Sequence, residues 1–95
     1  MVLIKLESVN REKLRQNANN LTKTLKRKRA RGVEIMGPVV APMPILVGRH
    51  RMQIILRSAD LKTFRGWLQQ VRPILRNASK ESVRVSLDVD PKHLM

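Results

Sequence analysis

Cysteine and tyrosine are absent from this 95-residue chain, and it has one phenylalanine, Phe64, and one tryptophan, Trp67. Without cysteine, disulfide bonds and cysteine-ligated zinc sites are excluded. No apolar run approaches the roughly 18 residues that a membrane-spanning helix needs, and the first residues contain no apolar segment of a signal peptide. We therefore expect an aliphatic core, no membrane partner and a cytoplasmic location.

Acidic residues are scarce as well. Seven Asp and Glu stand against 20 Lys and Arg, which gives a formal net charge of +13 and a sequence pI of about 11.7. Such a field attracts polyanions, and nucleic acid is the commonest partner of this kind. The alternative, a basic surface that is merely solvated, is weaker for so large a surplus in so short a chain.

Residues suited to catalysis are few. His50 and His93 have no cysteine or carboxylate at ligand spacing, so no metal site is expected. Asp88 and Asp90 would share one face of a strand, but pairing with arginines or capping a turn explains them better than acid–base chemistry. The phosphate-binding motif G-x-x-x-x-G-K-[ST] is missing. We expect this segment to have no enzymatic activity and no cofactor of its own.

Apolar periodicity predicts six elements of secondary structure. They are strands over residues 2–7, 33–37, 49–57 and 82–90, and helices over residues 9–32 and after Asp60. For the first helix, Asn10 is the predicted N-cap and Gly32 the predicted C-cap. Pro73 should kink or end the second helix. Between the second and third strands, the prolines of residues 37–48 predict a rigid loop.

This order of elements predicts an α+β fold for residues 1–95, taken as one domain and as a fragment of a larger chain. The expected architecture, β-α-β-β-α-β, is a four-stranded, mostly antiparallel sheet with both helices on one face. Strand alternation turns Met52, Ile54 and Leu56 toward the helices. The opposite, solvent-facing side of the sheet should then carry four arginines: Arg49, Arg51, Arg57 and Arg84.

Two surfaces are candidates for binding nucleic acid. The first is the segment "KTLKRKRAR", whose cations suit contacts with phosphates rather than with bases. These cations are Lys23, Lys26, Arg27, Lys28, Arg29 and Arg31. Their alternative role is to favour the C-terminal end of a helix dipole. The second is the open sheet face with its arginines, which lacks aromatic residues for base stacking. Packing against another domain is the alternative for that face.

Motifs in the second half of the chain resemble a known family. The sequence contains Gly37-Pro38 and Ala41-Pro42, then "GRHRMQ" at 48–53, and "DVDP" at 88–91. Together they are similar to the C-terminal domain of the bacterial replication-restart helicase PriA, primosomal protein N′. The resemblance covers nearly the whole chain. It implies a fold similar to that of a small-subunit ribosomal protein.

The resemblance also implies a function. The chain would be a domain that binds branched or single-stranded DNA, within a larger helicase that unwinds DNA with 3′-to-5′ polarity at stalled forks. ATP and zinc are implied for that parent enzyme only. The implied partners are DNA, the single-stranded DNA-binding protein and other primosome proteins. Where the family often has basic residues, this chain has an apolar stretch, and Ile45, Leu46 and Val47 are predicted to form a docking surface.

Three hypotheses therefore remain at this point: a DNA-binding module of a restart helicase, a free-standing RNA-binding or ribosomal-type protein, and an interdomain docking module. Under the first hypothesis, the loop at 37–48 and the following strand would form a pre-shaped basic ledge. Arg49, Arg51 and Arg57 on this ledge would guide a DNA backbone, with Arg84 nearby.

Overall fold

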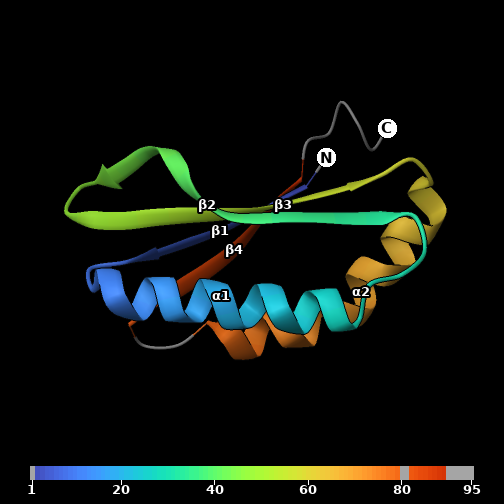
Figure 1. Ribbon diagram of the computed structural model, residues 1–95, viewed down its shortest axis with the longest axis horizontal. Coiled ribbons are helices and arrows are strands. Elements are labelled where there is room, and N and C mark those ends of the chain that lie inside the picture. The colour runs from blue at the N-terminus through green and yellow to red at the C-terminus, as the bar shows by residue number, and fades with distance from the viewer. Residues whose placement is uncertain (1, 80–81, 90–95) are drawn as a thin grey trace.

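The computed structural model describes residues 2–79 and 82–89, which fold into one sheet covered on one face by two helices (Figure 1). The elements along the chain are β1 Val2–Ser8, α1 Arg11–Arg27, β2 Val33–Leu46, β3 Arg49–Ser58, α2 Leu61–Ala78 and β4 Arg84–Val89. The predicted α+β class and the predicted order of elements are confirmed.

The sheet has the strand order β2-β3-β1-β4, and every neighbouring pair is antiparallel. The first strand thus occupies an inner position, with Ile4 opposite Ile54 of β3 on one side and Leu87 of β4 on the other. This is the split β-α-β arrangement, in which each helix connects two strands that are not neighbours. Strands β2 and β4 form the two edges of the sheet.

The core lies between the sheet and the helices, as the periodicities predict. Alternate residues of β1, namely Val2, Ile4 and Leu6, are at most 1% exposed and face α1 and α2. The helices contribute their apolar stripes, which include Leu14, Ala18, Leu21, Leu25, Phe64, Trp67, Leu68, Val71 and Leu75. A tertiary hydrogen bond closes one end of this layer, because the buried hydroxyl of Ser8 donates to the carbonyl of Ser82.

The first helix begins as predicted but ends earlier than predicted. The side chain of Asn10 accepts a hydrogen bond from the backbone N–H of Lys13 at 3.0 Å, which is an N-cap contact. The helix stops at Arg27, where the N–H of Lys28 bonds back to carbonyls of the last turn. Gly32, with φ of 86°, lies in the turn before β2. Its predicted role as C-cap is therefore wrong.

The predicted rigid loop is also wrong, because most of residues 37–48 belong to β2. The strand continues past Gly37-Pro38, a cis peptide bond, through two register shifts against β3. Prolines lack an N–H but are tolerated at a sheet edge, where one side of the strand needs no partner. Only Val47 and Gly48 remain as the connection, with φ of 51° and 75°. Positive φ at both positions is typical of a tight type I′ hairpin.

The second helix begins as predicted, and Pro73 does not end it. Asp60 caps its start by accepting hydrogen bonds from the N–H groups of Lys62 and Thr63. The helix then runs unbroken from Leu61 to Ala78 with Pro73 inside it. Proline removes one helical hydrogen bond, but Val71 and Leu75 on either side are buried against the sheet. Tertiary packing of the apolar stripe therefore outweighs the local preference.

Candidate nucleic-acid interface

A concentrated group of cations lies where α1 ends. We call it the basic turn, defined as Lys26, Arg27, Lys28, Arg29 and Arg31. All five side chains are exposed, as is Lys23 one turn earlier. Among the ion pairs that join described residues, none involves the basic turn. Its positive charge is therefore available to an external anion.

The backbone of the basic turn is held by the second helix. The indole Nε1 of Trp67 donates a hydrogen bond to the carbonyl oxygen of Lys28 at 2.8 Å. Trp67 is only 2% exposed and its ring lies 6.3 Å from that of Phe64. The early end of α1 has its physical reason here, since this carbonyl is bonded by a tertiary contact and not by an N–H of a further helical turn. The cations consequently extend from an anchored backbone.

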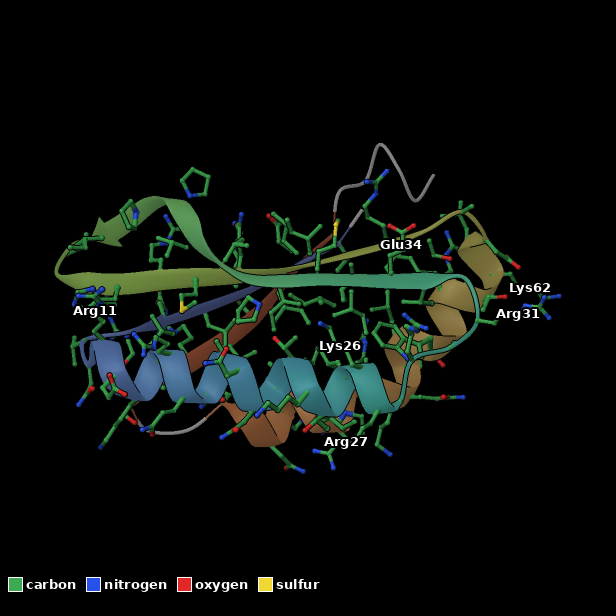
Figure 2. All side chains as sticks on the ribbon, viewed as in Figure 1. Arg11, Lys26, Arg27, Arg31, Glu34 and Lys62 are labelled. Carbon is green, nitrogen blue, oxygen red and sulfur yellow. The ribbon has the colours of Figure 1, made fainter. Side chains whose placement is uncertain are left out.

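The structure adds a cation that sequence reasoning missed. Figure 2 shows Arg31 and Lys62 at the same end of the molecule, beyond the last turn of α1. Lys62 is exposed and belongs to the first turn of α2. The two residues are distant in sequence, so no local pattern connects them. Arg57 is also placed toward this end, opposite Glu34 across the β2–β3 ladder.

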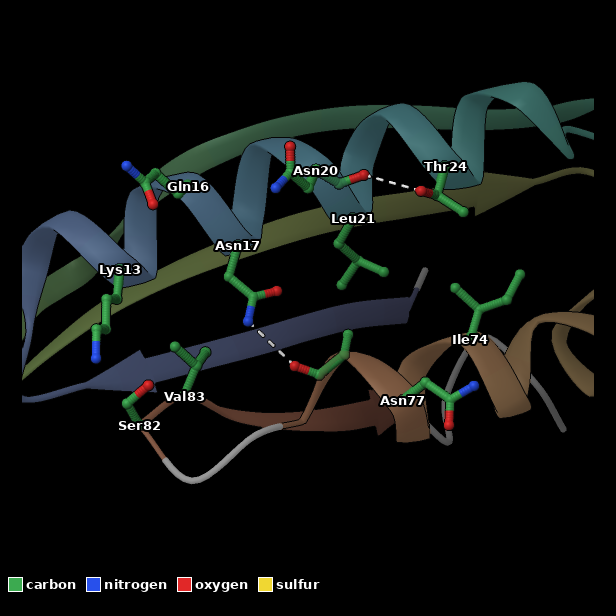
Figure 3. A pocket seen from close by; sticks show the side chains of 11 residues that line it. Lys13, Gln16, Asn17, Asn20, Leu21, Thr24, Ile74, Asn77, Ser82 and Val83 are labelled. Atoms are coloured by element: carbon green, nitrogen blue, oxygen red, sulfur yellow. Dashed lines mark hydrogen bonds between the residues drawn. The ribbon is translucent and has the colours of Figure 1, made fainter.

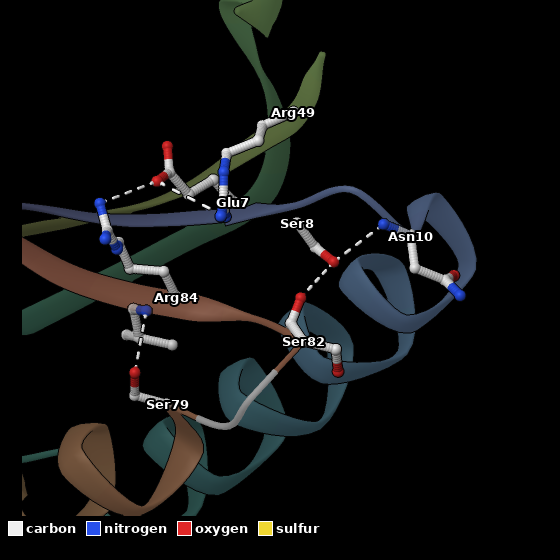
Figure 4. A network of polar contacts seen from close by, with 8 residues as sticks. Glu7, Ser8, Asn10, Arg49, Ser79, Ser82 and Arg84 are labelled. Carbon is white, nitrogen blue, oxygen red and sulfur yellow. Dashed lines mark hydrogen bonds and ion pairs between the residues drawn. The ribbon is translucent and has the colours of Figure 1, made fainter. Parts of the chain in front are cut away.

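The open sheet face carries the predicted arginines, but it is not uniformly basic. Arg51 and Arg84 are the cross-strand neighbours of Glu7 on its two sides. Oε1 of Glu7 lies 3.3 Å from Nη1 of Arg84 and 4.0 Å from Nη1 of Arg49. Figure 4 shows the Glu7 carboxylate between these two arginines. A single carboxylate thus pairs with two arginines and lies opposite a third, Arg51, in the ladder. The sequence contained Glu7, but only the strand order places it among them.

A second carboxylate is compensated in the same way. Oδ2 of Asp88 lies 3.0 Å from Nζ of Lys5, and both side chains are about half exposed. Asp88 thus pairs with a cation, as predicted, but the partner is a lysine and not an arginine. Asp90 and His93 lie outside the described residues. Within the described part of the chain, no group of histidine and acidic residues is placed to hold a metal ion.

The open face also carries a cluster of apolar residues. Met36, Ile55 and Leu3 lie side by side on three neighbouring strands, and Val39 is next to Met36 along β2. Met36 and Val39 are 37% and 40% exposed. This apolar cluster was not predicted, because the register shift at Gly37 is what brings Val39 onto the open face opposite Gln53.

The residues predicted to dock lie at the tip of the β2–β3 hairpin. Val47 is 93% exposed and Ile45 is 57% exposed, while Leu46 pairs with Arg49 in the last rung of the ladder. Beneath the hairpin is a cavity of about 240 Å³ lined by Ile45, His50 and Arg11 among others. The hairpin therefore exposes apolar side chains at the end of the molecule opposite the basic turn.

A further groove lies between the two helices (Figure 3). It has a volume of about 480 Å³ and a lining rich in amide side chains, with Lys13 as its one charged residue among those described. Nδ2 of Asn17 on α1 donates to the carbonyl of Ala78 on α2 at 3.1 Å. An amide-lined groove offers hydrogen bonds but little charge, so it does not match a phosphate backbone.

In the described part of the chain, neither helix combines the length and the apolarity that crossing a bilayer requires.

A comparison with curated proteins found no match. Among solved structures, the chain is similar to a de novo designed protein, Foldit4. The TM-score is 0.60 at 19% identity, over 94% of each chain, and this likeness concerns the fold alone. Among protein families, residues 1–92 match the primosomal protein N C-terminal domain. This match spans almost the entire sequence and agrees with the motifs around Gly37 and Asp88, so the chain belongs to the family of primosomal protein N C-terminal domains.

Proposed function

We propose that this primosomal domain binds forked or single-stranded DNA through its phosphates, with the basic turn as the principal contact. The observation that carries the proposal is the absence of any described acidic partner for the basic turn. The arginines of the open face differ in this respect, since Glu7 already pairs with Arg49 and Arg84.

The balance of charge supports this choice. The C-terminal end of a helix carries about half a negative charge, which by itself disfavours an anion. The basic turn places five cations at that end, so attraction of phosphate outweighs the dipole. Its aliphatic and cationic side chains offer no aromatic surface for stacking. Binding is therefore expected to depend on the backbone of the nucleic acid and little on its sequence.

The same proposal sets the domain within a longer replication-restart helicase of the bacterial cytoplasm. Other segments of that enzyme would hold ATP and zinc and would perform 3′-to-5′ unwinding. The domain itself would contribute binding and orientation of the fork. Contact with the single-stranded DNA-binding protein and other primosome proteins belongs to the proposal on the same grounds of family membership.

The experiment is a salt titration of this chain with a fluorescent forked DNA and with a single strand. If five phosphates are contacted, affinity should fall between roughly 50 and 200 mM salt by roughly 500-fold for the duplex of the fork and by roughly 130-fold for the single strand. Replacing Lys26, Arg27 and Arg29 by Gln should weaken binding and lower the salt slope by about one for each lost contact. RNA of the same sequence should be titrated in parallel, because a clear preference for RNA would favour the ribosomal-type alternative.

The matched control neutralises three arginines of the open face: Arg49, Arg51 and Arg84. We expect this variant to lose less affinity and less salt dependence than the basic-turn variant, because Glu7 already compensates part of that charge. If only the open-face variant loses binding, the principal contact is the sheet and the proposal for the basic turn is wrong. Binding that is insensitive to salt would contradict a phosphate-led contact altogether.

Docking against other domains is a second candidate function. Two observations favour it: the exposed hairpin residues Ile45 and Val47, and the apolar cluster of the open face around Met36 and Val39. This role is compatible with DNA binding, because the hairpin and the basic turn lie at opposite ends of α1. Ile45→Ser replaces an exposed apolar side chain of the hairpin by a polar one. This variant should keep its DNA affinity but assemble less well with the remainder of the helicase.

A further inference from the structure

The two edges of the sheet are built very differently. Edge strand β2 contains Pro38, Pro42 and Pro44, and its ladder with β3 shifts register twice. Proline lacks the N–H that a neighbouring strand would need, and bulges disturb the row of backbone groups. Strand β2 is thus protected against the addition of another strand.

Edge strand β4 has no such protection. It runs from Arg84 to Val89 without proline or glycine, and it stays in one register with β1 along its whole length. Within the sheet that the structure describes, no strand lies beyond it. Its outer side therefore presents a regular row of backbone donors and acceptors, which is a template for an added strand.

A groove lies beside this edge. It has a volume of about 380 Å³ and is formed by β4 and α2, with Leu75, Val85 and Leu87 among its lining residues. Val85 and Leu87 face the helices but remain partly exposed, whereas Ile4 at the same level of β1 is fully buried. An added strand would cover these two side chains with every second residue of its own.

The charge of the groove indicates what such a strand carries. Arg72 and Arg76 line it from α2, one helical turn apart, and both are exposed. No ion pair between described residues involves either of them. A strand that places an apolar residue against Val85 or Leu87 and a carboxylate near these arginines would match both properties.

We propose that the free edge of β4 binds an extended acidic segment of a partner protein by strand addition, with apolar and acidic side chains of that segment alternating in the groove beside α2. A second copy of this chain fits less well, because each copy carries a net charge of +13 and its own pair of groove arginines. The surface is distinct from the basic turn, so its occupation does not depend on DNA binding.

The test uses a fluorescent nine-residue peptide with blocked ends. Threonine occupies its odd positions, and valine and glutamate alternate in the even positions. Two further peptides carry N-methyl groups, one on the odd and one on the even amides. All three have the same charge and sequence, but only alternate amides of an added strand face its neighbour. We expect one methylated peptide to bind like the parent and the other to lose binding at least tenfold. Equal binding by all three would overturn the proposal in favour of charge attraction alone.

Protein variants locate the site. Arg72→Gln with Arg76→Gln should weaken peptide binding about fivefold, the range expected for two exposed ion pairs. Arg11→Gln with Arg15→Gln is the matched control, because these exposed arginines have the same spacing on α1 and should leave peptide affinity unchanged. Equal losses in both variants would contradict the assignment to β4.

Sedimentation equilibrium tests whether the chain dimerises. If it dimerises through β4 and the peptide cannot displace the second copy, the occupant of the edge is that second copy and the proposal is wrong.

Discussion

The indole nitrogen of Trp67 and the carbonyl oxygen of Lys28 form a 2.8 Å hydrogen bond between α2 and the residue that follows α1. The bond joins the buried ring layer of Trp67 and Phe64 to the most basic segment of the chain. It explains why α1 ends before the last cations of the basic turn. It also anchors the backbone from which those cations extend.

Trp67→Phe should test this bond, because it keeps a buried ring and removes the donor. Loss of one partly buried hydrogen bond should lower the free energy of unfolding by about 1–3 kcal/mol, with part of this cost arising from the smaller ring. Urea denaturation measures the change. Phe64→Leu serves as a control for ring packing, and it should leave the DNA affinity of the folded protein unaltered. Amide exchange at residues 28–31 that is unchanged in Trp67→Phe would contradict the anchoring role.

Val47 should be a site where substitution stabilises the protein. A β-branched residue with φ of 51° is strained, and the side chain is 93% exposed, so little packing offsets the strain. Val47→Asn or Val47→Gly should raise the free energy of unfolding by about 1 kcal/mol. Thermal denaturation gives the measurement. Val40→Asn is the control, since Val40 is also exposed but is not among the residues with positive φ, and it should bring no gain.

Gly37 should tolerate no side chain. Its φ is 113°, and a Cβ atom there would lie 3.1 Å from the carbonyl oxygen of Gln53 and 3.2 Å from the backbone nitrogen of Val39. Both obstacles are backbone atoms, which cannot move aside as a flexible side chain would. We expect Gly37→Ala to destabilise the fold by at least about 1 kcal/mol. Gly66→Ala is the control, because a methyl group at that position would point into open space, and on α2 it should stabilise by up to about 1 kcal/mol.

Core truncations should distinguish the enclosed part of the core from its partly exposed edge at β4. Leu68 is 7% exposed and Ile4 is fully buried, so Leu68→Ala and Ile4→Ala should each cost about 2–5 kcal/mol. The periodicity alone would assign Leu87 the same cost. Because Leu87 lies at the sheet edge and is only partly buried, we expect Leu87→Ala to cost clearly less. Equal losses in urea denaturation would mean that the groove beside β4 is closed.

Asp60 should make stability depend on pH. Hydrogen bonds from the Thr63 side chain, and then from the backbone N–H groups of Thr63 and Lys62, hold the pKa of this carboxyl below its ordinary value of 3.8. A lowered folded-state pKa contributes stability above the unfolded pKa, and this contribution disappears as the pH falls through the folded pKa. Asp60→Asn keeps a capping side chain but has no carboxylate charge. It should therefore be less stable than the parent at pH 7. The difference should vanish in acid, well below pH 3.8, as thermal denaturation across pH would show.

Some features of the protein follow from local sequence because their causes are local. The alternation in β1 and β3 and the apolar stripes of α1 and α2 depend on repeat periods of 2 and 3.6 residues, and both N-caps depend on contacts within three residues. The charge of the basic turn is likewise visible in the sequence. These patterns were sufficient to predict the order of elements, the core, and the cations of both candidate surfaces.

Only the tertiary structure decided the rest, since it depends on which strands become neighbours. Proline suggests a loop at residues 37–48, but a place at the sheet edge lets β2 continue through it. Glu7 is one acid among many cations in the sequence, yet the order β3-β1-β4 sets it between Arg51 and Arg84. The end of α1, the placement of Arg31 and Lys62 at the same end of the molecule, and the contrast between a protected β2 edge and an open β4 edge have the same origin. Each depends on contacts between residues far apart in the chain, and no periodicity of a single segment encodes them.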